Sequence, residues 1–321
     1  MAYVVRRLLL YIPVAFIVFT IVFWFIRLIP GDYADFLLLE SPSARDQAVQ
    51  LAIREDLGID EPAAKQYFVT LGRYVQGDLG RSMGDGKPVL NEILRRAPTT
   101  LEVSGFAILF ALLIAVPAGV ISAIWQGTII DYVTRVFAIL ALAVPNFWLA
   151  TLIVVYPANL WQYGAPFPYE GLFDDPWTNL QQVLPAAAVA GSISAGILAR
   201  FIRSALLEVL RQDYIRTARA KGLTERIITY RHILRNSIIP VVTTLGFALA
   251  GLASGSFIVE FWFGIPGVGL LALEALFNLD YPIIMALTIL GTTLFVLANL
   301  IVDLAYPFLD PRIRLGGGYL V

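Results

Sequence analysis

The chain of 321 residues is 58% apolar and 15% charged, with a mean hydropathy of +0.75, which leaves too little polar surface for a water-soluble globule. Its formal net charge of −1 says little, because in a membrane protein the distribution of charge matters more than the sum. With no cysteine and one histidine, His232, the sequence excludes disulfides, thiolate chemistry, Cys-ligated metal and multi-histidine zinc sites.

Six long stretches carry no charged residue, and each is long enough to cross a ~30 Å hydrocarbon core as a helix. The first exceeds the apolar region of a secretory signal and lacks an Ala-x-Ala cleavage pattern, so we interpret it as a retained span. The sequence therefore predicts an all-α integral membrane protein with six transmembrane helices. The uncharged stretches are residues 8–26, 103–130, 136–169, 176–199, 236–259 and 281–302.

The positions of lysine and arginine predict the orientation of these spans. If the N-terminus is cytoplasmic, the inner segments hold 14 of the 23 basic residues. The two short outer loops, at roughly 161–182 and 261–280, then contain no lysine or arginine. We therefore expect a multi-pass protein of the inner or plasma membrane with both termini cytoplasmic.

Residues between the first two spans are expected to form a folded external segment. A capping-box pattern predicts a helix over 44–57. A second helix is predicted from Asp60, with Pro62 in its first turn and Gly77 after its end. Its apolar face is expected to hold Tyr67, Leu71, Tyr74 and Val75.

Three prolines and one short apolar run predict irregularities within the membrane. Pro13, Pro117 and Pro145 are each positioned to kink a helix. The uncharged run 261–273 is too short to span and favours an outer re-entrant or interfacial segment.

A basic loop separates the fourth and fifth spans. Residues 200–235 hold nine basic and three acidic side chains in an otherwise helical composition. A short helix, a turn permitted by Gly222 and a second helix would form a protrusion that inserts into a groove of another protein. Ala218 lies four residues before Gly222, so two small residues would permit close approach. The alternative is a juxtamembrane loop that binds anionic lipid head groups.

At this loop the chain resembles the inner-membrane permeases of binding-protein-dependent ABC importers, in the dipeptide/oligopeptide/nickel branch (DppB/OppB-like). Their cytoplasmic loop carries the motif EAA, three residues, Gly. Here Arg216-Thr217-Ala218 and Gly222 fall into that register, with Arg216 in place of the Glu. The resemblance assigns ATPase coupling to Asp213, Tyr214, Arg216, Thr217, Ala218, Arg219, Lys221, Gly222 and Leu223.

Short matches to the family follow one another along nearly the whole chain. They include Ile29-Pro30-Gly31-Asp32, Leu57-Gly58-Ile59-Asp60, Gly77-Asp78-Leu79-Gly80-Arg81-Ser82, Val144-Pro145-Asn146-Phe147-Trp148, Asp280-Tyr281-Pro282 and Asp310-Pro311-Arg312-Ile313-Arg314. The resemblance implies a type I importer (MetI-like) transmembrane domain, paired with a second, similar permease, two ATPase subunits and an external solute-binding protein. It also implies that this chain binds no cofactor, since ATP and Mg belong to the ATPase subunits.

A search for catalytic chemistry agrees with a non-enzymatic subunit. The only Gly-Lys pair is Gly86-Lys87, which Pro88 follows, so the chain has no phosphate-binding P-loop. The ATPase must therefore be a separate chain, and no nucleic-acid partner is expected. Relatives carry peptides, nickel chelates and oligosaccharides, and the sequence does not choose among these solutes.

An ion-coupled secondary transporter is the alternative, since such carriers also have kinked helices. They usually place carboxylates within the membrane, where a charge costs at least ~2.5 kcal/mol. Here the charges fall near the span ends, which favours energy supplied from outside the membrane. The translocation path is expected to be lined by neutral polar residues, namely Asn146, Thr151, Ser192, Ser194, Thr243, Ser254 and Thr292.

The predicted organisation has four parts. Residues 1–30 form the cytoplasmic N-terminus and first span, and 31–97 form the external helical insertion. Residues 98–305 form a five-span core with the docking loop at about 206–236, and 306–321 form a cytoplasmic tail.

Overall fold

The computed structural model describes residues 2–29, 61–162, 164, 168–224 and 257–309, with a few isolated positions between 227 and 251. These parts are helical, and their only β-pairing is one isolated bridge, Arg81 to Pro88. Four helices are long and apolar enough to cross a membrane, and two bent helix pairs raise the number to as many as six. The helices are α1 (Ala2–Ile26), α4 (Ala63–Val75), α5 (Val89–Ile124), α6 (Ile129–Ala143), α7 (Asn146–Trp161), α8 (Pro176–Leu210), α9 (Asp213–Ala220), α12 (Phe257–Phe263), α13 (Val268–Phe277) and α14 (Tyr281–Leu309).

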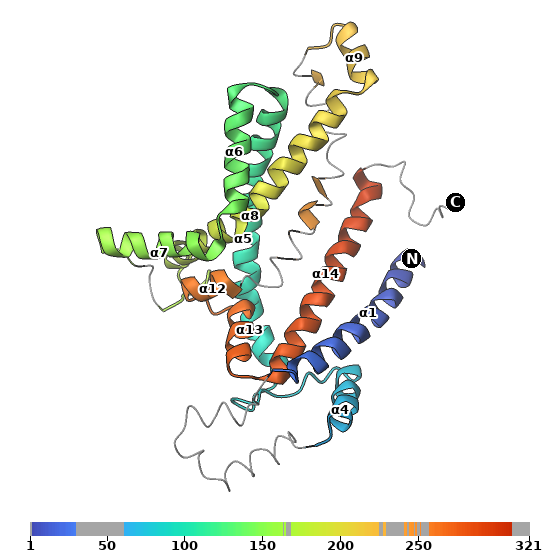
Figure 1. The fold of residues 1–321 in the computed structure, drawn as a ribbon, viewed down its shortest axis with the longest axis vertical. Coiled ribbons are helices and arrows are strands. Elements are labelled where there is room, and N and C mark those ends of the chain that lie inside the picture. Colours follow the sequence, from blue (N-terminus) through green and yellow to red (C-terminus); the bar gives the residue numbers. More distant parts are fainter. Residues whose placement is uncertain are drawn as a thin grey trace.

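Helices α5 and α8 form the centre of the molecule (Figure 1). Glycine lets their backbones approach closely. A Cβ added at Gly191 would lie 2.4 Å from the Ala107 carbonyl oxygen, and one at Gly119 would lie 2.7 Å from the Ile202 side chain. Such small-residue contacts are how helices pack in a membrane, where no hydrophobic force drives them together. The 103–130 and 176–199 predictions thus correspond to this central pair.

The predicted span over 136–169 is not one straight helix. Helices α6 and α7 meet at 92° across Val144 and Pro145 (Figure 1). Pro145 has no N–H to continue the helical ladder, and it restricts Val144 to the extended conformation observed, φ −81° and ψ 118°. The predicted effect of Pro145 is confirmed, whereas Pro13 and Pro117 lie inside continuous helices.

A second right-angle bend joins α12 to α13, as expected for a re-entrant or interfacial segment over 261–273. The buried carboxylate of Glu260 holds this corner. It accepts from the Thr100 hydroxyl at 2.8 Å and from the Leu270 amide at 2.8 Å, while the Val268 amide donates to Thr100 Oγ1 at 2.7 Å. The network ties the first turn of α13 to α5. Most of the predicted span over 236–259 lies outside the described residues.

The antiparallel helices α1 and α14 form the remaining layer. Arg7 near the start of α1 pairs with Asp303 near the end of α14 at 2.7 Å. At the other end, Phe19 and Phe23 of α1 pack against α4 through Tyr67, with ring centroids 5.7 and 5.1 Å apart. The first uncharged stretch and the last, 281–302, therefore form paired helices.

The second helix predicted in the external segment is present as α4. Tyr67 is buried on it, and Leu71 and Tyr74 pack beside the same aromatic cluster, whereas Val75 is exposed and was wrongly placed on that face. Gly77 ends the helix with φ +80°, as expected. The helix predicted over 44–57 lies outside the described residues.

The turn after α4 is fixed to the start of α14. Asp280 is buried, and it accepts from the Ser82 hydroxyl at 2.6 Å and the Met83 amide at 3.1 Å. Helix α5 then begins at Val89, so the domain boundary expected at residue 97 falls inside a helix.

Candidate functional site

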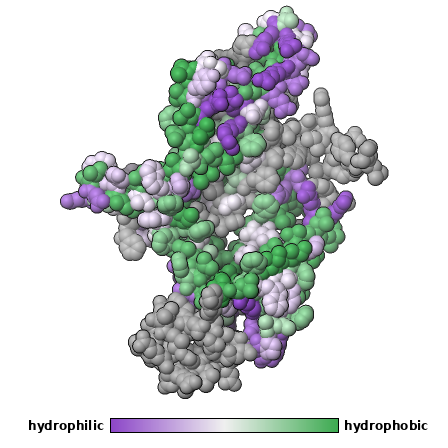
Figure 2. Space-filling view, in the orientation of Figure 1, coloured by the Kyte–Doolittle hydropathy of each residue, from purple (hydrophilic) through white to green (hydrophobic). Residues whose placement is uncertain are grey.

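The predicted docking residues lie at one extremity of the molecule. Helix α8 ends at Leu210, and two residues connect it to α9, which lies at the far end of α8 (Figure 1). Figure 2 shows hydrophilic residues gathered over this end and apolar residues over α6 below it. The α8–α9 hairpin is therefore a polar protrusion on an apolar body.

The turn after α9 is closed by a Schellman motif. The Leu223 amide donates to the Ala218 carbonyl at 3.3 Å, and the Gly222 amide donates to the Arg219 carbonyl at 2.9 Å. Gly222 has φ +79°, a left-handed conformation that costs any other residue roughly 1–2 kcal/mol. The turn predicted at Gly222 is confirmed, and its geometry alone explains the glycine.

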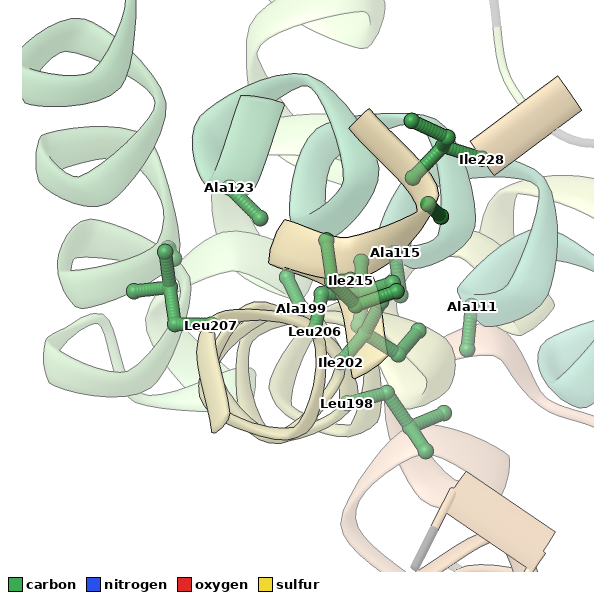
Figure 3. Close-up of a cluster of buried hydrophobic side chains, with 13 residues drawn as sticks. Ala111, Ala115, Ala123, Leu198, Ala199, Ile202, Leu206, Leu207, Ile215 and Ile228 are labelled. Atoms are coloured by element: carbon green, nitrogen blue, oxygen red, sulfur yellow. The ribbon is translucent and has the colours of Figure 1, made fainter. Parts of the chain in front are cut away.

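One face of α9 packs on this chain rather than facing outward. Ile215 is fully buried and Ala218 is 7% exposed, within a cluster that includes Leu206 of α8 and Ala115 of α5 (Figure 3). Ala218 is thus small because it contacts the chain's own core. Ala218 therefore lies off the exposed face of α9, and its role in docking stays a prediction.

The opposite face of α9 is exposed. An ion pair on this face, Arg216 with Asp213 at 3.6 Å, has side chains 76% and 95% exposed and so contributes little to stability. Tyr214 and Leu223 add two half-exposed apolar side chains to a mainly basic surface. The exposed docking residues are Asp213, Tyr214, Arg216, Thr217, Arg219, Lys221, Gly222 and Leu223.

The predicted path residues are dispersed. Thr151, Ser192 and Thr292 each donate to a carbonyl of their own helix, at 2.7, 2.8 and 2.9 Å. These helices are α7, α8 and α14, and α7 and α14 lie on opposite sides of the central pair (Figure 1). Ser194 is half-buried on α8, and Thr243 and Ser254 lie outside the described residues. The lining of the path stays a prediction.

Asn146 differs from the other predicted path residues. Its side-chain oxygen is buried at the Pro145 corner and has no hydrogen-bond partner among the described residues. A buried acceptor without a partner costs roughly 1–3 kcal/mol, so it is a candidate to receive a donor from another molecule.

Two buried polar clusters were not predicted from the sequence. Asp131 and Glu260 were both assigned to span ends, but each is buried and each contacts a helix distant in sequence. An isolated charge beside an apolar stretch was the available signal. The partners, Arg203 and Thr100, could not be identified without the fold. Among the described residues, no group of three His, Cys, Asp or Glu side chains is placed to hold a metal ion.

Comparison with known proteins finds two family models along the chain. The model described as "Binding-protein-dependent transport system inner membrane component" matches residues 115–315, and the model of the corresponding N-terminal region matches residues 1–104. The dipeptide transport system permease DppB of Alkalihalophilus pseudofirmus is 37% identical over 98% of this chain and 99% of its own length. The glutathione transport system permease GsiC of Escherichia coli K12 is 37% identical over 97% of this chain and 98% of its own.

Solved structures share the fold at low sequence identity. A chain from an amino acid ABC transporter is 14% identical with a TM-score of 0.51, and the match covers 70% of this chain and 95% of that one. A chain from the MetNI methionine ABC transporter, in an inward-facing conformation, is 17% identical with a TM-score of 0.51, covering 66% and 95%.

Proposed function

Because this chain belongs to the family of binding-protein-dependent transport system inner membrane components, we propose that it is one of two permease subunits of an ATP-driven importer for short peptides. The observation that carries the proposal is the exposed α8–α9 hairpin of a chain that has no P-loop of its own. Such a subunit needs a surface on which separate ATPase chains act. A peptide-type solute is proposed because the two relatives are dipeptide and glutathione transport system permeases.

The proposed complex contains a second, similar permease, two ATPase subunits that hold ATP and Mg, and an external binding protein. In this arrangement ATPase closure would displace the hairpin and change which side of the membrane the path opens to. The exposed face of α9 would contact the ATPase, and both chain termini would lie on the cytoplasmic side. The Arg7–Asp303 pair supports placing both ends on one side, because it joins the start of α1 to the end of α14; the choice of the cytoplasmic side rests on the distribution of basic residues.

The ion-coupled alternative finds less support. In the described part of the chain, the buried carboxylates of Asp131, Glu260 and Asp280 each accept hydrogen bonds from neighbouring groups of the chain. A coupling ion or proton would have to displace those partners. Energy supplied by a separate ATPase makes no such demand.

A pair of glycine variants tests the docking surface. Gly222 and Gly77 both follow a helix with positive φ, +79° and +80°, and a Cβ at either would meet no atom within 4 Å. Valine is therefore equally strained at both turns, but only one turn adjoins the proposed ATPase contact. We expect Gly222→Val to reduce ATPase co-purification and peptide uptake while the permease remains inserted, and Gly77→Val to retain the ATPase.

Neutralising Arg219 and Lys221 distinguishes docking from lipid binding. On a lipid surface each basic residue contributes about 1 kcal/mol, so their replacement would matter more than the turn. Docking predicts the opposite order: neutralising Arg219 and Lys221 should reduce ATPase retention less than Gly222→Val does. Wild-type ATPase retention by Gly222→Val would refute the docking assignment.

A further inference from the structure

A buried ion pair lies beneath the docking hairpin. Asp131, in the first turn of α6, is 1% exposed, and its carboxylate accepts from Arg203 of α8 through Nε at 2.9 Å and Nη2 at 3.0 Å. The Ser122 hydroxyl donates to it at 2.5 Å and the Gly127 amide at 3.0 Å. The end of α5, the turn to α6 and α8 therefore all meet at one carboxylate.

The pair is one of the points at which α6 contacts α8. Asp131 and Ala138 are the buried residues of α6, and both face α8. A Cβ at Gly196 would lie 2.7 Å from the Ala138 carbonyl oxygen, so the backbones touch there. Asp131 and Ala138 are seven residues apart, as are Arg203 and Gly196 on the antiparallel α8. The two contacts thus lie two turns apart on one face of each helix.

The anchored helix is directly linked to the docking hairpin. Arg203 lies about two turns before the end of α8, and α9 follows after two residues. Ile215 of α9, Leu206 of α8 and Ala138 of α6 belong to one buried cluster, part of which Figure 3 shows. A displacement of α9 therefore acts on α8 and α6 through packed side chains.

A buried ion pair is suited to fixing orientation rather than to adding stability. The cost of removing both charges from water largely offsets their attraction, and a well-packed apolar pair is often as stable. The planar guanidinium instead sets the angle of the carboxylate it grips with two hydrogen bonds. A packed apolar contact would permit sliding of α6 that this geometry resists.

We propose that Asp131 and Arg203 are a positioning pair that makes α6 move with the docking hairpin, so that ATPase closure reaches α6 and, through the Pro145 corner, α7. This inference rests on the proposed function, because it requires an ATPase to act on α9. It assigns the pair to transmission of the movement and not to ATPase binding.

The test uses a double variant without either charge to separate the transmission of movement from the stability of the complex. Asp131→Asn alone leaves Arg203 without its counter-charge and is expected to lower the melting temperature of the purified complex. Asp131→Asn with Arg203→Met removes both charges. The asparagine oxygen can still accept from the Gly127 amide, and the Ser122 hydroxyl can accept from the asparagine NH2 group. We expect this double variant to recover most of the melting temperature and to retain the ATPase. In proteoliposomes supplied with binding protein, the double variant should accumulate about tenfold less peptide per ATP hydrolysed than the wild type. We call this quantity the transport-to-hydrolysis ratio.

The control is a second ion pair between helices. Arg7→Met with Asp303→Asn removes the α1–α14 pair, which does not involve the docking hairpin, and should leave the transport-to-hydrolysis ratio unchanged. The conservative Arg203→Lys variant keeps the charge without the planar fork and should give an intermediate ratio.

Three results would overturn the inference. They are a wild-type ratio in the double variant, an equal loss of the ratio in the Arg7 and Asp303 control, and failure of the double variant to retain the ATPase. In the last case the pair would build the docking surface itself. Failure of the proposed function would look different, since no ATPase would then co-purify with the wild-type permease.

Discussion

Replacement of Gly119 by alanine tests the close approach of α5 and α8. The added methyl group would lie 2.7 Å from Cβ and Cγ2 of Ile202 and 2.8 Å from the Ala199 carbonyl oxygen. Carbon atoms in favourable contact are about 3.5–4.0 Å apart, so the two helices would have to separate by about 1 Å. Overpacking of this kind costs roughly 1–3 kcal/mol, because backbone atoms cannot rotate away as the end of a side chain can.

The same helix provides a matched control at Gly105, where an added Cβ meets no atom within 4 Å. Alanine is favoured over glycine within a helix by roughly 0.5–1 kcal/mol, so Gly105→Ala should be neutral or stabilising. Thermal unfolding of the detergent-solubilised protein, followed by size-exclusion recovery, compares the two. We expect a lower melting temperature for Gly119→Ala only. Equal melting temperatures for the two variants would refute the close packing of α5 on α8.

Two further predictions concern orientation and pH. In intact cells, a membrane-impermeant thiol reagent should label Asp174→Cys and not Thr224→Cys, since the proposed topology places these exposed positions on opposite sides; labelling of both would contradict it. Burial, with the neighbouring Glu102 carboxylate, raises the pKa of Tyr169 to about 12. The raised pKa means that the folded state favours the neutral phenol. The contribution of this group to the free energy of unfolding is therefore complete below about pH 10 and is lost as the pH rises toward 12. Tyr169→Phe should therefore flatten the decline in melting temperature over that window, and an unchanged decline would count against this contact.

The positions of most helices followed from the absence of charge, because a long apolar run in a membrane protein has few alternatives to a helix. The corner at Pro145 was signalled by a local rule, the effect of proline on the preceding residue. The angle of 92° could not be predicted in the same way, because a proline permits a range of kinks and the packing of α6 against α8 selects one.

Faces of helices were harder to predict than their positions. Ala218 and Gly222 are four residues apart, and this spacing correctly predicted a helix with a turn after it. It could not show that Ala218 faces the chain's own core, because the helices it contacts come from other parts of the sequence. Val75 was misplaced for a similar reason, since a helical face predicted from apolar residues alone includes positions at its edge.

The buried carboxylates explain how a chain with few charges fixes its bends. Asp131, Glu260 and Asp280 each lie at a corner or helix start, and their partners Arg203, Thr100 and Ser82 are 72, 160 and 198 residues away. Amide N–H groups at the start of a helix have no hydrogen-bond partner within the helix, and a membrane offers little water to bind them. A carboxylate there accepts their hydrogen bonds and removes the cost of leaving them unsatisfied. In the described part of the chain, the Pro145 corner has no such anion, and the buried side-chain oxygen of Asn146 has no hydrogen-bond partner. Among these bends of the described residues, the corner between α6 and α7 therefore lacks a buried carboxylate to tie it to a distant helix, which suits the proposed movement of α6 relative to α7.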